Sequence, residues 1–159
     1  MAVIRSSLPF VKEGKLHQEQ SMSYLISYFA ILLPFGLLDA AWLSLMGPRL
    51  YRPTLGDILL ANVNVAPAIA FYLTYPIGIL VFAVLPALKS ESAASALIYG
   101  ALFGGLAYAT YDLTNHATLR NWTLQLTLAD MAWGAIASGV AAVVAFYLTR
   151  TVGGWFGGA

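Results

Sequence analysis

The sequence predicts an all-α integral membrane protein: a bundle of four transmembrane helices with a short interfacial helix in the first connection. Two observations lead to this fold class. The chain of 159 residues is 60% hydrophobic and only 9% charged, whereas a soluble domain carries about 25% charged residues. Its apolar residues also gather in four stretches long enough for an α-helix to cross a bilayer, which takes about 20 residues.

The connections define the order of the elements. We expect the spans at residues 24–46, 67–88, 93–113 and 123–149. Gly47-Pro48 should end the first helix, because proline interrupts the hydrogen-bonding ladder. A short helix in the membrane interface should follow, because apolar residues then recur at helical spacing: Leu50, Tyr51, Leu55, Ile58 and Leu59. The second connection is only four residues, 89–92, so the second and third helices should be antiparallel neighbours.

Around this four-helix domain, residues 22–150, we expect two tails. Residues 1–21 are polar and should rest on the membrane surface or on a partner chain, and residues 151–159 are rich in glycine. Five of the eight lysines and arginines lie on the side of the termini: Arg5, Lys12, Lys15, Lys89 and Arg150. The other side has Arg49, Arg52 and Arg120. This bias predicts that both termini face the cytoplasm.

Composition also excludes several classes of function. The chain has no cysteine, which excludes disulfides, thiolate metal sites and thiol catalysis. Its net charge of +1 does not indicate a nucleic-acid partner, which would need a basic face. No compact metal-ligand motif is present, so we predict no metal and no cofactor. The partner that the composition does require is the lipid bilayer.

Polar residues gather toward one membrane face. Asp39 and Asp130 each lie about 10 Å below that face at about 1.5 Å per residue, and Asp112 closes the third helix near it. We predict that the cluster binds a ligand through these residues: Asp39, Trp42, Asn64, Tyr108, Asp112, Asn115, His116, Arg120, Asp130 and Trp133.

A charged residue deep in the bilayer costs about 2.5–3.5 kcal/mol and is a functional candidate by default. Asp39 and Asp130 should therefore point into the bundle, within reach of Asp112, His116 or an arginine, and should be either protonated or paired with a cation. The alternative is a polar network that only fixes the register of the helices. His116 is a candidate general base or metal ligand, or an ordinary interfacial histidine.

Small residues predict how the third and fourth helices pack. The pair Gly100 and Gly104 lies on the third helix, and a stripe of small and polar residues follows the fourth: Thr123, Thr127, Asp130, Gly134, Ser138, Ala141 and Ala145. Such faces allow membrane helices to approach closely. Pro67 and Pro76 should be local kinks in the second helix.

Asp39-Ala-Ala-Trp42 and Asp130-Met-Ala-Trp133 share a pattern. An inverted repeat would place the two aspartates toward opposite membrane faces. Since both lie toward the same face, we interpret the likeness as coincidence.

The sequence resembles a bacterial family of small four-helix membrane proteins, domain of unknown function 2177. The resemblance covers about residues 22–147 and is carried by these stretches: Leu38-Asp-Ala-Ala-Trp-Leu43, Tyr51-Arg-Pro-Thr-Leu-Gly56, Phe71-Tyr-Leu-Thr-Tyr75, Pro86-Ala-Leu88, Ala107-Tyr-Ala-Thr-Tyr-Asp-Leu-Thr-Asn-His-Ala-Thr-Leu119 and Thr127-Leu-Ala-Asp-Met-Ala-Trp-Gly134. It implies a four-helix fold in the bacterial inner membrane. It implies no activity and no catalytic residue.

Three functions remain open. The first is the binding of a small apolar molecule or lipid in a polar-lined opening on one membrane face, by a binder or a lipid-modifying enzyme. The second is a non-catalytic accessory subunit of a larger membrane complex. The third is a proton-coupled carrier, which uses chains of acids and histidine, although four helices are few for a lone carrier. We favour the first.

Overall fold

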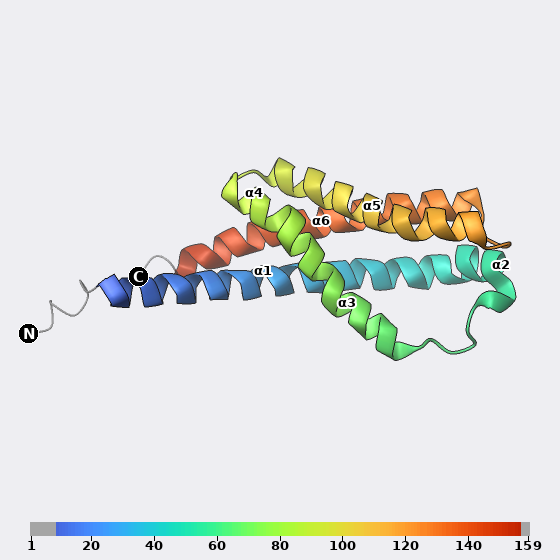
Figure 1. Ribbon diagram of the computed structural model, residues 1–159, viewed down its shortest axis with the longest axis horizontal. Coiled ribbons are helices and arrows are strands. Elements are labelled where there is room, and N and C mark those ends of the chain that lie inside the picture. The colour runs from blue at the N-terminus through green and yellow to red at the C-terminus, as the bar shows by residue number, and fades with distance from the viewer. Residues whose placement is uncertain (1–8, 157–159) are drawn as a thin grey trace, which may run out of the picture.

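The fold is a bundle of membrane-spanning helices, as the sequence predicts. The computed structural model describes residues 9–156, and every regular element in that range is a helix (Figure 1). Four helical segments are long and apolar enough to cross a membrane: Gln20–Ile58, Val65–Lys89, Ala93–Thr118 and Leu124–Val152. Residues 1–8 and 157–159, which belong to the two predicted tails, lie outside the described residues.

Helix α1 begins earlier than predicted. It covers Pro9–Met46, so it begins well before the apolar span starts. It ends at Met46, directly before Gly47-Pro48, as predicted. The chain continues through a π-helical turn, η2 (Gly47–Tyr51), in which the Arg52 N–H donates to the Gly47 carbonyl, and then through α2 (Arg52–Leu55). Proline is tolerated there because Pro48 lies in the first turn of the new register, where its missing N–H is not needed.

The short helix of the first connection covers the end of the bundle. Leu50 and Leu55 are buried and pack with Trp122 and Leu126 in a small apolar cluster. The Asn121 side chain donates to the Leu55 carbonyl at 3.5 Å. A 3-10 turn, η3 (Gly56–Ile58), follows and begins at a glycine with a φ of 56°, a conformation that is costly for residues with a Cβ. This segment therefore joins the first span to the connection between the third and fourth.

The second span is built from three pieces: α3 (Val65–Ile79), the π-helical turn η4 (Leu80–Val84) and α4 (Leu85–Lys89). Pro76 lies inside α3, just before the π turn, where an irregularity was expected. Pro67 lies in the first turn of α3, so the prediction of a kink there was wrong. In Figure 1 α3 slants across α1 and leaves the bundle at its N-terminal end.

Helices α5 (Ala93–Thr118) and α6 (Leu124–Phe156) form the tightest contact of the bundle. They are antiparallel, and α6 also packs against α1 (Figure 1). A Cβ placed on Gly104 would lie 2.0 Å from the Gly134 carbonyl oxygen, and one placed on Gly100 would lie 2.8 Å from the Ala142 Cβ. The predicted close packing of these two helices through small residues is confirmed.

The apolar core has two parts with a polar layer between them. The larger part is centred on Ile31, Phe35, Ile79 and Phe146, and the smaller part is the cluster around Trp122. Along α1 and α6, the buried aspartates lie between the two. The fold therefore places the buried aspartates of α1 and α6 in one layer toward one end of the bundle.

Candidate functional site

Asp39 of α1 lies where three helices meet. Its side chain is 5% exposed. One carboxylate oxygen accepts a hydrogen bond from the Tyr72 hydroxyl of α3 at 2.6 Å, and the other accepts one from the Trp133 indole N–H of α6 at 3.0 Å. Both oxygens thus have donors, and both donors are neutral. As predicted, Asp39 points into the bundle.

Asp130 of α6 is buried in a similar way, with 4% of its side chain exposed. It accepts a hydrogen bond from the Tyr51 hydroxyl of η2. The same hydroxyl accepts a hydrogen bond from the Trp42 indole N–H of α1 at 2.9 Å. A chain of donors therefore leads from α1 through the π turn to the carboxylate on α6.

The two networks form one unit. The Trp42 and Trp133 rings stack with their centroids 4.5 Å apart and their planes at 6°. We name Asp39, Trp42, Asp130 and Trp133 the Asp–Trp clasp. In each motif the tryptophan follows its aspartate by about one turn, and α1 and α6 run in opposite directions. Each tryptophan therefore comes level with the aspartate of the other helix, so the two motifs meet in the structure.

Asp112 of α5 differs from the other two aspartates. It is 0% exposed, and neither carboxylate oxygen forms a hydrogen bond with a described residue. Buried polar atoms in proteins are almost always hydrogen-bonded, so each exception needs an explanation. No hydrogen bond of the described residues joins Asp112 to Asp39 or Asp130.

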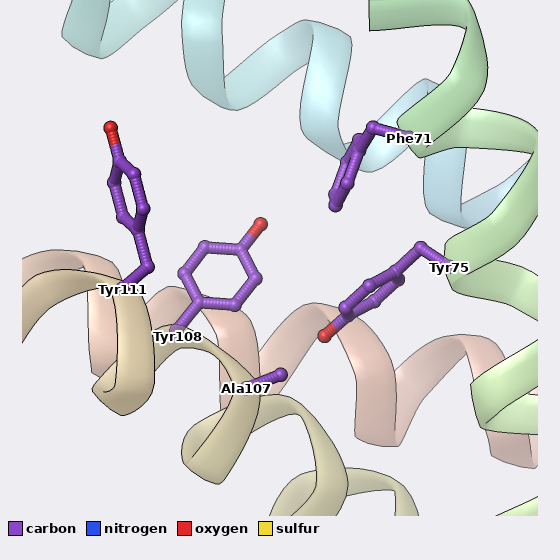
Figure 2. Close-up of a pocket in the computed structure, with 5 residues that line it drawn as sticks. All are labelled: Phe71, Tyr75, Ala107, Tyr108 and Tyr111. Carbon is purple, nitrogen blue, oxygen red and sulfur yellow. The ribbon is translucent and has the colours of Figure 1, made fainter. Parts of the chain in front are cut away.

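An aromatic pocket of about 440 Å³ lies between α3 and α5. Figure 2 shows Phe71 and Tyr75 on the α3 side and Ala107, Tyr108 and Tyr111 on the α5 side. The Tyr75 hydroxyl is hydrogen-bonded to the Ser138 hydroxyl of α6 at 2.9 Å. The Tyr108 hydroxyl points into the space between the rings and forms no hydrogen bond with a described residue. It is therefore free to bond to an occupant of the pocket.

A comparison with protein families identifies the family of this chain. A family model described as a predicted membrane protein (DUF2177) matches residues 24–147. The chain belongs to the DUF2177 family. No curated protein and no solved structure matches it. The clasp and every residue that lines the pocket lie inside the matched range, so both belong to the part of the chain that defines its DUF2177 membership.

In this DUF2177 protein, four residues of the predicted cluster lie away from the clasp. The Asn64 side chain caps α3 by accepting from the Ala66 N–H at 3.3 Å. Asn115 is half-buried, and His116 and Arg120 are exposed. Within the described residues no group of three or more histidines, cysteines or acids is arranged to hold a metal ion. The structure thus assembles Asp39, Trp42, Asp130 and Trp133 and leaves the polar connection outside.

Of the two alternatives for the buried aspartates, protonation or a cationic partner, the described residues provide no cationic partner. Arg49, Arg52 and Arg120 are exposed at the end of the bundle, and no ion pair joins them to an aspartate within residues 9–156. Phenol and indole groups satisfy a carboxylate without bringing a second charge into the bilayer. Sequence reasoning overlooked Tyr51 and Tyr72, and it also overlooked the pocket residues Phe71, Tyr75, Ala107 and Tyr111.

One signal for the pocket was present in the sequence. Phe71 and Tyr75 are four residues apart and so share one face of a helix, and Tyr108 and Tyr111 do the same at a spacing of three. Paired aromatic faces on neighbouring helices indicate either a packed contact or a site for a flat or apolar ligand.

Proposed function

We propose that this protein binds an apolar molecule of the bilayer, a lipid chain or a small lipid-soluble compound, in the pocket between α3 and α5. The pocket itself carries the proposal. Its volume of about 440 Å³ falls within the range of about 300–1,000 Å³ that is typical of small-molecule sites. Its lining is almost entirely aromatic, so the favourable term would be the burial of apolar surface and ring contacts.

The position of the pocket supports an occupant that comes from the membrane. Tyr75 and Tyr108 each lie roughly 15 Å along their helices from the nearer end of the span, at about 1.5 Å per residue, so the pocket is deep in a hydrocarbon layer about 30 Å thick. Phe71 and Tyr111 are 36% and 59% exposed. Since these exposed edges face lipid in a membrane, the ligand can enter sideways without crossing water.

One polar group would fix the orientation of a ligand in the pocket. The Tyr108 hydroxyl can donate to a carbonyl or accept from a hydroxyl of the ligand (Figure 2). The ligand class that fits best is therefore mainly apolar with at least one oxygen. The clasp supports the opposite wall, because Tyr72, next to Phe71 on α3, donates to Asp39.

We also propose that the protein lies in the inner membrane of a bacterium with both termini in the cytoplasm. An even number of spans returns the chain to the side on which it began, and five of the eight lysines and arginines lie on that side.

Photo-crosslinking tests the binding proposal. The purified protein is placed in vesicles that contain a phospholipid with a diazirine in its acyl chain, and adducts are mapped by mass spectrometry. We expect adducts concentrated on the segments around Phe71–Tyr75 and Ala107–Tyr111. The variant Ala107→Phe fills the pocket and should remove most of them. Ala132→Phe, at an exposed position of α6, is the matched control and should leave them unchanged.

Tyr108→Phe tests the polar contact. Loss of one hydrogen bond, worth about 0.5–1.5 kcal/mol, should weaken retention of an oxygen-bearing ligand by roughly 2- to 10-fold. Adducts spread evenly over all exposed helix faces, and insensitive to Ala107→Phe, would rule out a specific pocket. A second membrane subunit that stays bound through purification in mild detergent, with no lipid retained, would favour the accessory-subunit alternative instead.

A further inference from the structure

The carboxyl group of Asp112 lies in surroundings that do not suit a charge. It is completely buried within the third span, roughly 9 Å from the Thr118 end of α5 at about 1.5 Å per residue. An ionised carboxylate there would need hydrogen-bond donors or a nearby cation, because its water has been removed. Neither oxygen of Asp112 has a hydrogen-bond partner among the described residues.

The packing of α5 on α6 shows which groups face Asp112. A Cβ on Gly104 would meet Gly134 and Ser138, and one on Gly134 would meet the Tyr108 ring. Continued by one turn, this antiparallel register brings Asp112 level with the stretch of α6 between Thr127 and Asp130.

The polar groups of that stretch are already engaged. The Thr127 hydroxyl accepts from the Trp122 indole N–H at 3.2 Å and donates to the Thr123 carbonyl at 3.1 Å. Asp130 is itself an acid, and one of its oxygens already accepts from Tyr51. Neither residue offers Asp112 a free donor, and Arg120, the basic residue of the adjoining turn, is exposed.

The three buried aspartates thus differ in how well a negative charge would be stabilised. Asp39 accepts two hydrogen bonds, Asp130 accepts one and Asp112 accepts none. When acids interact in a low-dielectric region, the proton stays on the group whose charged form is least stabilised. We infer that Asp112 binds a proton at neutral pH and is a proton-binding site inside the membrane.

A proton fits this site better than a metal ion. Within residues 9–156 no three acids or histidines come together as ligands, and a proton neutralises a single carboxyl without further ligands. The site also lies four residues, about one turn, from Tyr108 of the pocket. Exchange of this proton would change the charge next to both the pocket and the close contact of α5 with α6. The inference concerns Asp112 alone and does not depend on the pocket having a ligand.

Infrared spectroscopy of the full chain tests the inference without requiring a reagent to reach the buried group. A protonated carboxyl has a C=O stretch that is separate from the bands of carboxylates, and labelling aspartate with carbon-13 shifts it. In lipid at neutral pH we expect one such label-sensitive band from the wild-type protein. It should disappear in Asp112→Asn and persist in Asp39→Asn and in Asp57→Asn, an exposed control position.

Thermal unfolding in mild detergent provides a second readout. An amide resembles a neutral acid in size and charge, so Asp112→Asn should melt at the temperature of the wild type. The inference is overturned if the wild type shows no acid band, or if the band survives Asp112→Asn. It is also overturned if Asp112→Asn shifts the melting temperature strongly in either direction, since removal of an ionised group would either strand its partner or relieve an unpaired charge.

Discussion

Gly104 is the position where the addition of one methyl group is expected to damage the bundle most clearly. A Cβ there would lie 2.0 Å from the Gly134 carbonyl oxygen, 2.4 Å from the Ser138 Oγ and 2.6 Å from the Ser138 Cβ. The closest of these atoms belongs to the backbone of α6, so no side-chain rotation can relieve the clash. Gly104→Ala therefore requires α5 and α6 to move apart.

The expected magnitude follows from two opposing terms. Overpacking of a close contact costs about 1–3 kcal/mol, while alanine is favoured over glycine in a helix by up to about 1 kcal/mol. Gly36→Ala is the matched control, because Gly36 also lies inside a helix and a Cβ there meets nothing within 4 Å. The helix term cancels between the two variants. Gly104→Ala should therefore be less stable than Gly36→Ala by about 1–3 kcal/mol, or roughly 5- to 150-fold in the folded-to-unfolded ratio.

Titration from mild detergent into sodium dodecyl sulfate, followed by tryptophan fluorescence, measures this difference. Both variants should remain helical, because membrane helices keep their internal hydrogen bonds when the tertiary contacts are lost. If Gly104→Ala and Gly36→Ala unfold at the same detergent fraction, the two helices do not pack through their backbones and the argument from close contact fails.

Two further predictions concern the clasp and the orientation. Trp133→Phe should destabilise the protein more than Trp42→Phe in the same titration. Trp133 donates to Asp39, and its loss leaves one buried oxygen of that side chain without a donor, at a cost of about 1–3 kcal/mol. Trp42 donates to the Tyr51 hydroxyl, worth about 0.5–1.5 kcal/mol, and Tyr51 still donates to Asp130 without it. Equal losses would contradict this difference. A reporter that works only in the periplasm should be inactive when fused after Ala159 and active when inserted between residues 118 and 122, and the reverse pattern would refute the orientation.

The existence of the four spans followed from the sequence because it depends on local properties, length and apolar composition. The positions where the helices begin and end were predicted less accurately. Helix α5 continues five residues beyond its predicted end, and its polar residues explain why: the Thr114 and Thr118 hydroxyls bond to the carbonyls of Thr110 and Thr114 at 2.6 and 2.8 Å. The hydroxyls of these threonines are hydrogen-bonded within their own helix, so the presence of polar residues did not mark the point where the helix ends.

The partners of the buried acids depended on information that the sequence pattern does not contain. The depth of Asp39 and Asp130 in the bilayer was enough to predict that both point inward, because a charge that faces lipid at that depth is costly. Tyr51, which bonds to Asp130, lies in a π turn that changes the register after Gly47, and Tyr72, which bonds to Asp39, lies on a helix that crosses α1 at a slant (Figure 1). Hydrophobic periodicity gives the faces of a regular helix, and it cannot give the effect of an extra residue in a turn or the crossing angle of two helices.

The clasp and the pocket are linked through two adjacent residues of α3, Phe71 and Tyr72. Tyr72 donates to Asp39, and its neighbour Phe71, whose ring centroid lies 5.2 Å from that of Tyr72, lines the pocket. Because the N-terminal end of α3 leaves the bundle (Figure 1), the bond of Tyr72 to Asp39 and that of Tyr75 to Ser138 hold the rest of this helix against α1 and α6. A carboxylate with two neutral donors is suited to this task, since it binds strongly without a second charge in lipid. The buried acid that first indicated a ligand site therefore shapes the pocket from behind and does not line it.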